Sequence, residues 1–311
     1  MEDLVENKDG LVYIDGKIVP SGDAKISVFD SAFVHGDSVQ EFTRTFKGEL
    51  FKLDKHLDRL YKSLKSARID IEESPEELKE ITLKVLNLNR NFIGKKGDGW
   101  IVHLISAGIL PKWRKEGLEY RKNTIAIFFI PFKFKSFAKF YRTGANAVIS
   151  TIRRVHYSSI DPKMKQCSRM DLNLASREVQ NMDPEAYVLL LDYEGNITEG
   201  DGQNIFIVSN GVLKTPTARN IMKGISRDTV FELAKELGIK VEEVDLQPYD
   251  VYNADEAFLT ATSFCIMPLT KFNWINIGNG KPGPIAFKLL DAWSKKVGID
   301  IVQQALSHIE K

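Results

Sequence analysis

The 311 residues are enough for two domains, each with an apolar core of its own. The 43 basic and 42 acidic residues leave a formal net charge of +1, so no overall field favours nucleic acid or an anionic membrane as a partner. No apolar run approaches the ~20 residues that span a bilayer, and the charged first residues lack the apolar segment of a secretory signal. We therefore expect a cytoplasmic protein that binds neither nucleic acid nor membranes.

Side chains that commonly bind metals are few and scattered. The two cysteines, Cys167 and Cys265, make neither a disulfide framework nor a zinc site, which is typical of a reducing compartment. The five histidines show no spacing typical of metal ligands. We expect no metal centre.

The N-terminal half begins with short strands. Apolar β-formers flank the turn pair Asp15-Gly16 in residues 11–19, which predicts a hairpin. A loop is expected through residues 28–36. Residues 39–51 then alternate around a second turn at Lys47-Gly48 and predict another pair of strands.

Two helices and two further strands follow. Residues 53–68 carry leucines at helical spacing, with Asp54 as the expected N-cap, and residues 75–88 repeat this pattern. Residues 100–110 and 124–132 are apolar and β-branched, which predicts buried strands. Helices inserted into a set of strands indicate an α+β domain over residues 1–132.

Two arginines in this domain have more than one interpretation. The alternation places Arg44 beside Phe42 and Phe46 on an otherwise apolar strand face, where either an ion pair at a sheet edge or a functional role would explain it. Arg59 lies beside the leucine stripe of the first helix, where spacing alone favours a solvent-exposed residue.

Residues 133–146 interleave basic and aromatic side chains. Such a segment could suit single-stranded nucleic acid, or it could be a linker whose lysines extend over an apolar floor. The near-zero net charge favours the linker. We place the domain boundary here and expect residues 147–311 to form the second domain.

The second domain alternates strands and helices. The expected strands are residues 147–153, 186–191, 204–208, 212–214, 239–244, 256–260 and 265–270, with a hairpin turn at Asn210-Gly211. The expected helices are residues 172–181, 225–237 and 284–297.

Three stretches carry the chemistry. Residues 161–171 offer lysine amines, and residues 195–200 place Glu199 at a strand end before glycines that let a ligand approach. Residues 223–228 open a helix with a glycine and a serine, which makes an anion site. An amine, a carboxylate and a phosphate site are what a pyridoxal-phosphate enzyme must supply.

The order of these motifs resembles the fold-type IV pyridoxal-phosphate enzymes, the class IV aminotransferases, over nearly the whole chain. The resemblance implies a mixed α+β and α/β fold of two domains, in which the larger C-terminal domain has a barrel-like sheet and the cofactor lies in the cleft between the domains. The motifs are His56-x-x-Arg59-Leu60, Lys165, Thr198-Glu199-Gly200-x-x-x-Asn204-x-Phe206, Gly224-Ile225-Ser226-Arg227 and Ala261-Thr262-Ser263.

The resemblance also implies roles for single residues. Lys165 matches the lysine that forms a Schiff base with the cofactor, and the motif spacing favours it over Lys163. Glu199 matches the carboxylate that pairs with the pyridine nitrogen. The implied phosphate site combines Arg59 with the helix start and the Ala261–Thr262 turn; its helix-start members are Gly224, Ile225 and Ser226.

Two positions depart from the family pattern. Met170 stands where many relatives have a tyrosine that contacts the cofactor's phenolic oxygen, so Arg169 or a water is expected to replace it. His35 stands where many relatives have a tyrosine before the glycine of the first active-site loop, and its imidazole can still donate a hydrogen bond.

The resemblance implies ping-pong transamination between an amino acid and a 2-oxo acid. It also implies a homodimer, since relatives complete the active site with a loop from the neighbouring subunit. Alternatives are a D-amino-acid or (R)-amine transaminase, an aminodeoxychorismate-type lyase on the same fold, and a cofactor-binding protein without turnover.

The substrate is expected to be an aliphatic L-amino acid of the branched-chain type. Residues 100–108 lack the arginine that D-amino-acid-type relatives carry there, so the α-carboxylate would need other donors. Those are backbone amides near Thr262 and Ser263, Arg44 and His35. The candidate walls of an apolar pocket, each of which could equally be core, are Phe33, Phe42 and Phe134.

Overall fold

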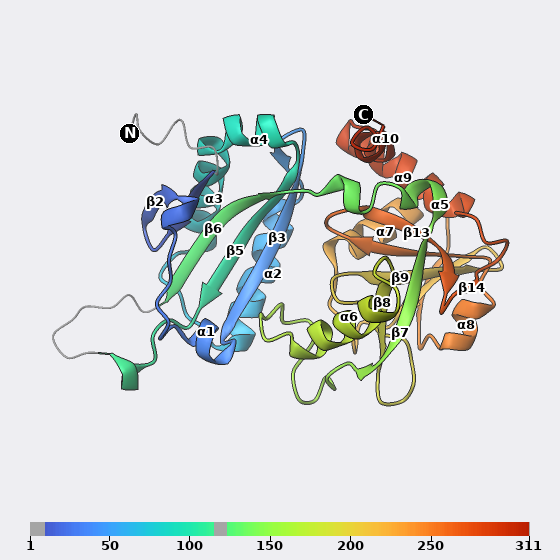
Figure 1. The fold of residues 1–311 in the computed structure, drawn as a ribbon, viewed down its shortest axis with the longest axis horizontal. Coiled ribbons are helices and arrows are strands. Elements are labelled where there is room, and N and C mark those ends of the chain that lie inside the picture. The colour runs from blue at the N-terminus through green and yellow to red at the C-terminus, as the bar shows by residue number, and fades with distance from the viewer. Residues whose placement is uncertain (1–9, 115–122, 311) are drawn as a thin grey trace. The chain divides into compact units, whose positions relative to one another are not determined.

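The computed structural model describes residues 10–114 and 123–310. The chain forms two compact units (Figure 1). Unit 1 comprises Met1–Phe132 and Met164–Ser168, and unit 2 comprises Lys133–Lys163 and Arg169–Lys311. The short excursion of residues 164–168 into unit 1 carries Lys165, although the sequence pattern assigns this lysine to the C-terminal domain.

Unit 1 is built on an antiparallel sheet in the order β2-β1-β6-β5-β3-β4. Both predicted hairpins are confirmed, with Asp15 and Lys47 at positive φ in their turns. The strands are β1 (Leu11–Ile14), β2 (Lys17–Pro20), β3 (Ser38–Phe46), β4 (Glu49–Leu50), β5 (Gly99–Ser106) and β6 (Thr124–Pro131).

Helices α2 (Leu53–Ala67) and α3 (Pro75–Leu88) cover one face of this sheet (Figure 1). The leucine stripe of α2 is buried against isoleucines of β5 and β6, as the periodicity predicts. The expected N-cap of α2 is wrong. Lys52 occupies that position at φ 54, and Asp54 lies in the first turn, where its carboxylate still faces the positive end of the helix dipole.

Residues 28–36, expected as a loop, contain helix α1 (Ser31–His35). Asp30 caps it by accepting a hydrogen bond from the Ala32 N–H at 2.8 Å, and Gly36 ends it at φ 70. The cap explains why so short a helix forms here without an apolar stripe. Unit 1 also contains α4 (Arg90–Lys96), η2 (Ser21–Asp23) and η3 (Pro111–Trp113).

Unit 2 is built on a mixed sheet in the order β11-β10-β9-β12-β13-β7-β8, with β14 paired to β13. The pairs of β7 with β8, β7 with β13, and β10 with β11 are parallel. The strands are β7 (Ala145–Arg153), β8 (Tyr187–Leu191), β9 (Asn204–Ser209), β10 (Val212–Pro216), β11 (Val241–Val244), β12 (Glu256–Ala261), β13 (Cys265–Phe272) and β14 (Ile275–Asn276).

A short extended segment links the two end strands of this sheet. The Leu190 N–H of β8 donates to Glu199 O at 3.0 Å, and the Ile197 N–H donates to Leu246 O, just beyond β11, at 2.6 Å. These bonds curl the sheet toward a closed, barrel-like form and fix the backbone of Glu199.

The helices of unit 2 agree with the predicted ones within a few residues. They are α6 (Met170–Met182), α7 (Ile225–Glu236) and α9 (Pro284–Val297), to which the structure adds α5 (Phe140–Thr143), α8 (Pro248–Tyr252), α10 (Ile301–Leu306) and η4 (Phe134–Ser136). α6 packs on β7 and β8, and α9 packs on β12 and β13.

Residues 133–146, expected to be a linker, belong to the body of unit 2. The aromatic side chains of the segment are buried, and the Tyr141 hydroxyl donates to Phe264 O at 2.6 Å. Lys133 and Lys135 are exposed. The basic and aromatic residues therefore alternate because the segment packs with its aromatic side chains buried and these lysines in solvent.

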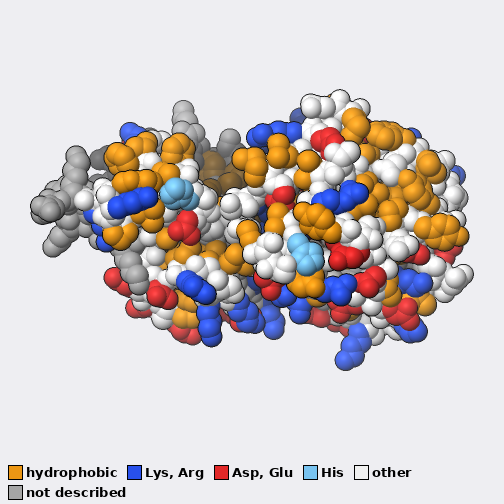
Figure 2. All heavy atoms as spheres, turned by 90° about the horizontal axis from the view of Figure 1, so that it is seen from below, with side chains coloured by type: hydrophobic (Ala, Val, Ile, Leu, Met, Phe, Trp, Pro, Cys, Tyr) orange, Lys and Arg blue, Asp and Glu red, His pale blue; other side chains and the backbone are white. Residues whose placement is uncertain are grey.

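The surface drawn in Figure 2 intersperses basic and acidic side chains with apolar ones. Within residues 10–114 and 123–310, no helix is both long and apolar enough to cross a bilayer.

Candidate active site

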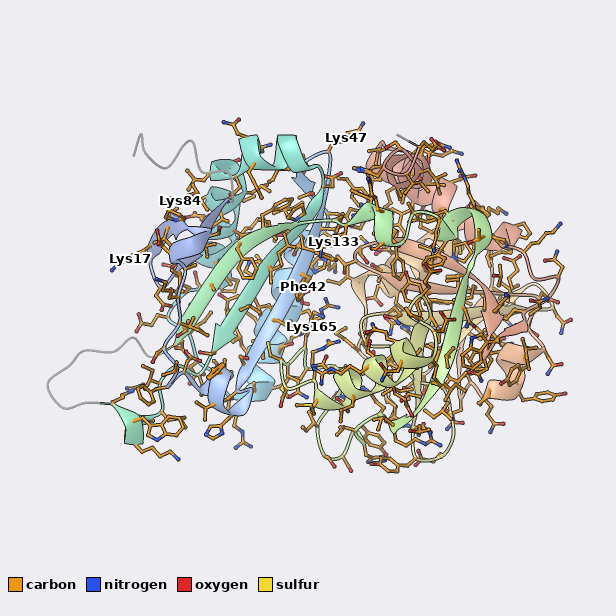
Figure 3. All side chains as sticks on the ribbon, viewed as in Figure 1. Lys17, Phe42, Lys47, Lys84, Lys133 and Lys165 are labelled. Carbon is orange, nitrogen blue, oxygen red and sulfur yellow. The ribbon has the colours of Figure 1, made fainter. Side chains whose placement is uncertain are left out.

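Lys165 lies beside β3 of unit 1. Its segment runs along β3, where the Gln40 N–H donates to Lys165 O at 2.9 Å and the Cys167 N–H donates to Ser38 O at 2.9 Å. The Lys165 N–H donates to the Ser63 hydroxyl of α2 at 3.1 Å. Its ammonium nitrogen is 5.5 Å from the centre of the Phe42 ring, and Figure 3 labels both residues.

Lys163, the rival lysine, has a different environment. It belongs to unit 2, its side chain is 44% exposed, and its ammonium group pairs with Asp161 at 2.9 Å. Lys165 is half-buried and its backbone is held by a strand and a helix. Of the two, Lys165 therefore has the partly desolvated, fixed position that favours a reactive amine.

Beneath this lysine, a charged cluster is buried between β3 and α2. The Glu41 side chain is 0% exposed, and it accepts from Arg59 Nε at 2.8 Å and from Arg59 Nη2 at 2.6 Å. The Nδ1 atom of His56 lies 2.9 Å from the same carboxylate. Burial would raise the pKa of Glu41, but the Arg59 guanidinium and the His56 ring outweigh it and hold that pKa well below its usual range.

The sequence pattern placed Arg59 on a helix surface, yet its side chain is only 13% exposed. Because α2 turns once every 3.6 residues, His56 and Arg59 lie on the same side of the helix and reach one carboxylate together. The partner Glu41 was not singled out in the sequence. The sequence could have indicated Glu41, because it is a lone charged residue on the same strand face as Val39, which is fully buried.

The same buried face holds one further histidine. His103 on β5 is paired in register with Glu41 on β3, and its Nε2 atom lies 2.8 Å from the Thr82 hydroxyl. Burial lowers the pKa of His103 to about 4, although the Glu41 charge raises it in opposition. His103 is therefore neutral at pH 7.

The other residues suggested for unit 1 lie outside this buried cluster. His35 is exposed at the end of α1, stacked on Trp113 with the ring centres 5.7 Å apart. Arg44 is 2% exposed, with its guanidinium carbon 3.7 Å above the centre of the Phe46 ring. Phe33 is 72% exposed on α1. The burial of Arg44 favours a packing role over contact with a substrate.

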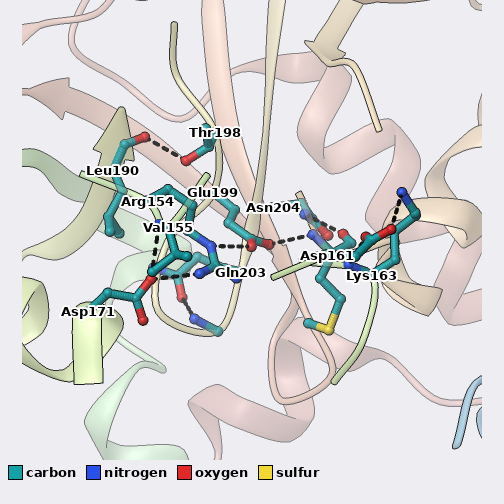
Figure 4. A network of polar contacts seen from close by, with 12 residues as sticks. Arg154, Val155, Asp161, Lys163, Asp171, Leu190, Thr198, Glu199, Gln203 and Asn204 are labelled. Carbon is teal, nitrogen blue, oxygen red and sulfur yellow. Dashed lines mark hydrogen bonds and ion pairs between the residues drawn. The ribbon is translucent and has the colours of Figure 1, made fainter. Parts of the chain in front are cut away.

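In unit 2, Glu199 is 4% exposed and both carboxylate oxygens accept hydrogen bonds. Oε1 accepts from Arg154 Nε at 3.1 Å, and Oε2 accepts from the Met222 N–H at 2.9 Å (Figure 4). Burial raises the pKa of Glu199 above its usual value, and Arg154 opposes that shift. No sequence pattern pointed to Arg154, because it follows the end of a strand and its partner Glu199 is distant in the chain.

The two sequence motifs of unit 2 meet around Asn204. Its amide nitrogen donates to Met222 O at 3.0 Å, three residues before α7 begins at Ile225. A Cβ on Gly224 would lie 2.3 Å from Asn204 Oδ1, so only glycine fits there. No side chain caps the start of α7, which leaves the amides of Ile225 and Ser226 to face an anion.

The third predicted element of unit 2 is a tight turn. Ala261 ends β12, and Thr262 and Ser263 form the turn before Cys265, which has φ 61 and starts β13. Thr262 and Ser263 are half-buried. Phe134, a suggested pocket wall, is instead 3% exposed and stacked on His308 at 4.4 Å.

Taken one by one, these groups suit parts of a phosphorylated pyridine cofactor. The uncapped start of α7 suits a phosphate dianion, the buried Glu199 carboxylate suits a protonated ring nitrogen, and Lys165 supplies an amine. Within the described residues, no group of three His, Cys, Asp or Glu side chains is arranged to hold a metal ion.

Comparison with known proteins decides the family. The family model described as "Amino-transferase class IV" matches residues 38–272. The chain belongs to the class IV aminotransferases. It is thus a pyridoxal-phosphate-dependent aminotransferase, as the motifs predicted, and its two-domain fold is that of the family.

Two relatives of this aminotransferase illustrate the similarity. It is 37% identical to a Methanocaldococcus jannaschii protein provisionally assigned as a branched-chain-amino-acid aminotransferase, over 89% of this chain and 93% of that one. The branched-chain aminotransferase of Thermoproteus uzoniensis, solved with norvaline, is 30% identical, with a TM-score of 0.81 over 93% of this chain and 94% of that one.

A third protein, the T.th. branched-chain amino acid aminotransferase, has been solved with pyridoxamine 5'-phosphate. It is 30% identical with a TM-score of 0.81, over 93% of this chain and 94% of that one. The same enzyme has also been solved with N-(5'-phosphopyridoxyl)-L-glutamate.

Proposed function

We propose that this aminotransferase moves an amino group between an aliphatic L-amino acid of the branched-chain type and a 2-oxo acid such as 2-oxoglutarate, by a ping-pong mechanism in the cytoplasm. The names of the relatives support the donor, and the phosphopyridoxyl-L-glutamate bound by the T.th. enzyme supports the acceptor. The two cysteines, neither of them in a disulfide, suit a reducing compartment.

The observation that carries the substrate class is the sheet face of unit 1 opposite the helices. Side chains alternate along β3, β5 and β6, so one set packs on α2 and α3 and the other set faces away. Apart from Gln40 and Arg44 on β3, the second set is mostly apolar, and the centre of the Phe42 ring lies 5.5 Å from the Lys165 ammonium nitrogen. Its half-buried members include Phe42, Trp100, Leu104 and Phe128. Phe42 and Trp100 pack edge to face with ring centres 6.0 Å apart. Such a surface suits an aliphatic side chain.

The carboxylate of the substrate would bind polar groups outside this face. We assign it to backbone amides at Thr262 and Ser263 and to His35. Arg44 is not retained, because its guanidinium is buried under Phe46. The β5 strand carries no arginine, so the bidentate clamp expected of D-amino-acid-type relatives is absent from it.

The cofactor would be held mainly through its phosphate. Its phosphate would meet Arg59, the amides of Ile225 and Ser226, and the Thr262 hydroxyl. Gly224 and Ala261 carry small side chains or none, which lets their backbone approach the ligand. When bound, pyridoxal phosphate supplies an electron-withdrawing ring that carries the amino group between the two substrates.

Two side chains would act on protons. The Lys165 amine would hold the cofactor and would move a proton at the substrate Cα. Glu199, as an anion, keeps a proton on the ring nitrogen, which stabilises negative charge at Cα.

The homodimer is supported by an exposed apolar surface on unit 1. Five apolar side chains near α1 are between 41% and 72% exposed. A surface of this kind on a single chain is typical of a protein interface, and a second copy of the chain is the partner we propose. The residues are Ile26, Val28, Phe29, Phe33 and Val34.

A donor screen tests the substrate. The holoenzyme is assayed with L-leucine, L-valine, D-alanine and simple (R)-amines against 2-oxoglutarate and pyruvate. We expect the highest kcat/KM for the aliphatic L-amino acids. A clear preference for D-alanine, or for an amine without a carboxylate, would refute the substrate class, and pyruvate release from aminodeoxychorismate would indicate the lyase.

Borohydride reduction followed by peptide mapping tests the lysine. Lys165→Ala should lose covalent cofactor attachment and nearly all turnover. Lys163→Ala is the matched control, since it removes a surface lysine from the same stretch, and it should retain both. A reduced adduct on Lys163 would overturn the assignment.

A further inference from the structure

Arg154 is held between two carboxylates in unit 2. It follows the last residue of β7, and its N–H donates to Leu191 O at 2.9 Å, which fixes its backbone on β8. Its Nε donates to Glu199 Oε1 at 3.1 Å and its Nη1 donates to Asp171 Oδ2 at 2.6 Å (Figure 4). The side chain is only 10% exposed, so both ion pairs are largely shielded from solvent.

These contacts fix the plane of the Glu199 carboxylate. Arg154 occupies Oε1 and the Met222 N–H occupies Oε2 at 2.9 Å. Each oxygen of a carboxylate can accept two hydrogen bonds, so both oxygens retain capacity for one further donor. That donor is the cofactor's ring nitrogen if Glu199 has the role proposed above.

The charges of this cluster depend on Arg154. Burial raises the pKa of Glu199 and so favours its neutral form. The positive charges of Arg154 and Arg169 lower that pKa and favour the carboxylate. Arg154 contacts the carboxylate directly, through its hydrogen bond to Oε1. Asp171, on the opposite side of the guanidinium, partly offsets the positive charge that Glu199 experiences.

We infer that Arg154 is a positioning residue for transamination, which acts through Glu199 by keeping it ionised and by holding its carboxylate toward the ring nitrogen. The inference rests on the proposed role of Glu199. A positive charge on the far side of Glu199 keeps the shared proton on the ring nitrogen. Asp171 acts in the opposite sense, because its negative charge draws the proton back toward Glu199.

The two variants should therefore differ in ring protonation. Arg154→Met removes the positive charge with an unbranched side chain of similar length, and the proton should move from the ring nitrogen toward Glu199. Asp171→Asn removes the offsetting negative charge, and the proton should stay on the ring nitrogen at least as strongly as in the wild type. If Arg154 had a role in packing alone, ring protonation would change in neither variant.

The direct measurement is the ¹⁵N chemical shift of ring-labelled pyridoxal phosphate bound to each variant at pH 7. We expect the wild type and Asp171→Asn near the protonated limit, and Arg154→Met displaced toward the unprotonated limit. Arg177→Met removes an exposed arginine of α6 and is the matched control, which should keep the wild-type shift. Equal shifts in Arg154→Met and wild type would overturn the inference.

A second measurement applies if Arg154→Met does not retain cofactor. Arg154→Lys keeps the charge but loses the two-armed geometry, and it should keep a protonated ring while kcat falls by about tenfold. In a Glu199→Gln background the same substitution should cost less than about twofold, because the residue through which it acts is gone. Equal losses in the two backgrounds would contradict the inference.

The Glu199→Gln enzyme separates this inference from the proposed function. If its ring nitrogen stays protonated and its turnover stays near wild type, Glu199 is not the nitrogen's partner, and that part of the proposed function fails. If Glu199→Gln moves the ¹⁵N shift and Arg154→Met does not, only the role of Arg154 fails.

Discussion

Replacing Glu41 should destabilise the apo protein strongly, although Glu41 belongs to no motif. Its carboxylate is 0% exposed and accepts two hydrogen bonds from Arg59, at 2.8 and 2.6 Å, and one from the Phe42 N–H at 2.9 Å, with His56 Nδ1 also 2.9 Å away. Glu41→Gln keeps the shape but removes the charge and turns an amide donor toward the guanidinium. Breaking a buried pair from one side costs about 3–5 kcal/mol, and we expect about 3 kcal/mol here.

The assay is calorimetry of the apo protein. At roughly 3 °C per kcal/mol for a chain of this size, Glu41→Gln should lower Tm by about 10 °C at pH 7. Asp58→Asn is the matched control on α2. Its ion pair with Lys62 is 56% and 73% exposed, so its loss should cost less than ~0.5 kcal/mol.

The pH dependence gives a second check. The pKa of Glu41 is lower in the folded protein than its ordinary value of 4.5, so its stabilising contribution is fully present above that value and is lost as the pH falls toward the folded value. The Tm difference between wild type and Glu41→Gln should therefore narrow below pH 4.5. A difference worth less than about 1 kcal/mol at pH 7, or one that does not change with pH, would refute this reasoning.

Three further outcomes are expected. His103 has a pKa of about 4 in the folded protein against an ordinary 6.5, so the protein should lose about 3 kcal/mol of stability as the pH falls through that interval. In His103→Leu, the urea midpoint should depend less on pH over the same interval. Gly200→Ala should destabilise by about 2 kcal/mol in urea, because its Cβ would lie 2.5 Å from Val188 O, whereas Gly202→Ala, with nothing within 4 Å, should be near neutral. Arg59→Lys should raise the cofactor's dissociation constant about tenfold in a spectrophotometric titration while preserving a charge beside Glu41, and Lys62→Ala should not; unchanged affinity in Arg59→Lys would remove Arg59 from the phosphate site.

The sequence by itself determined the features whose causes are local. Gly16 and Gly48 have φ 86 and 77, which glycine adopts readily, so the pairs Asp15-Gly16 and Lys47-Gly48 favour both hairpin turns. The spacing of leucines from Leu53 to Leu64 sets the buried side of α2. The order of the motifs from His56 to Ser263 was enough to suggest the family that the comparison then showed, because a shared chemistry restricts residue type at such positions.

Only the tertiary structure decided which charges are buried and what compensates them. Arg154 and Glu199 are 45 residues apart in the chain, and Arg59 and Glu41 are 18 apart. Side-chain periodicity gives the face on which a residue lies, but the cost of burying its charge depends on a partner brought from another element.

The same reason explains the segment assignments. Residues 133–146 resemble a linker because their charges alternate with aromatic rings, yet the rings are buried and the segment joins unit 2. Residues 164–168 leave unit 2 to bond along β3. The local sequence does not predict which distant strand such a segment pairs with, because any extended segment can form hydrogen bonds with the same backbone N–H and C=O groups. The sequence therefore singled out Lys165 as the candidate lysine, whereas its surroundings were decided by the fold.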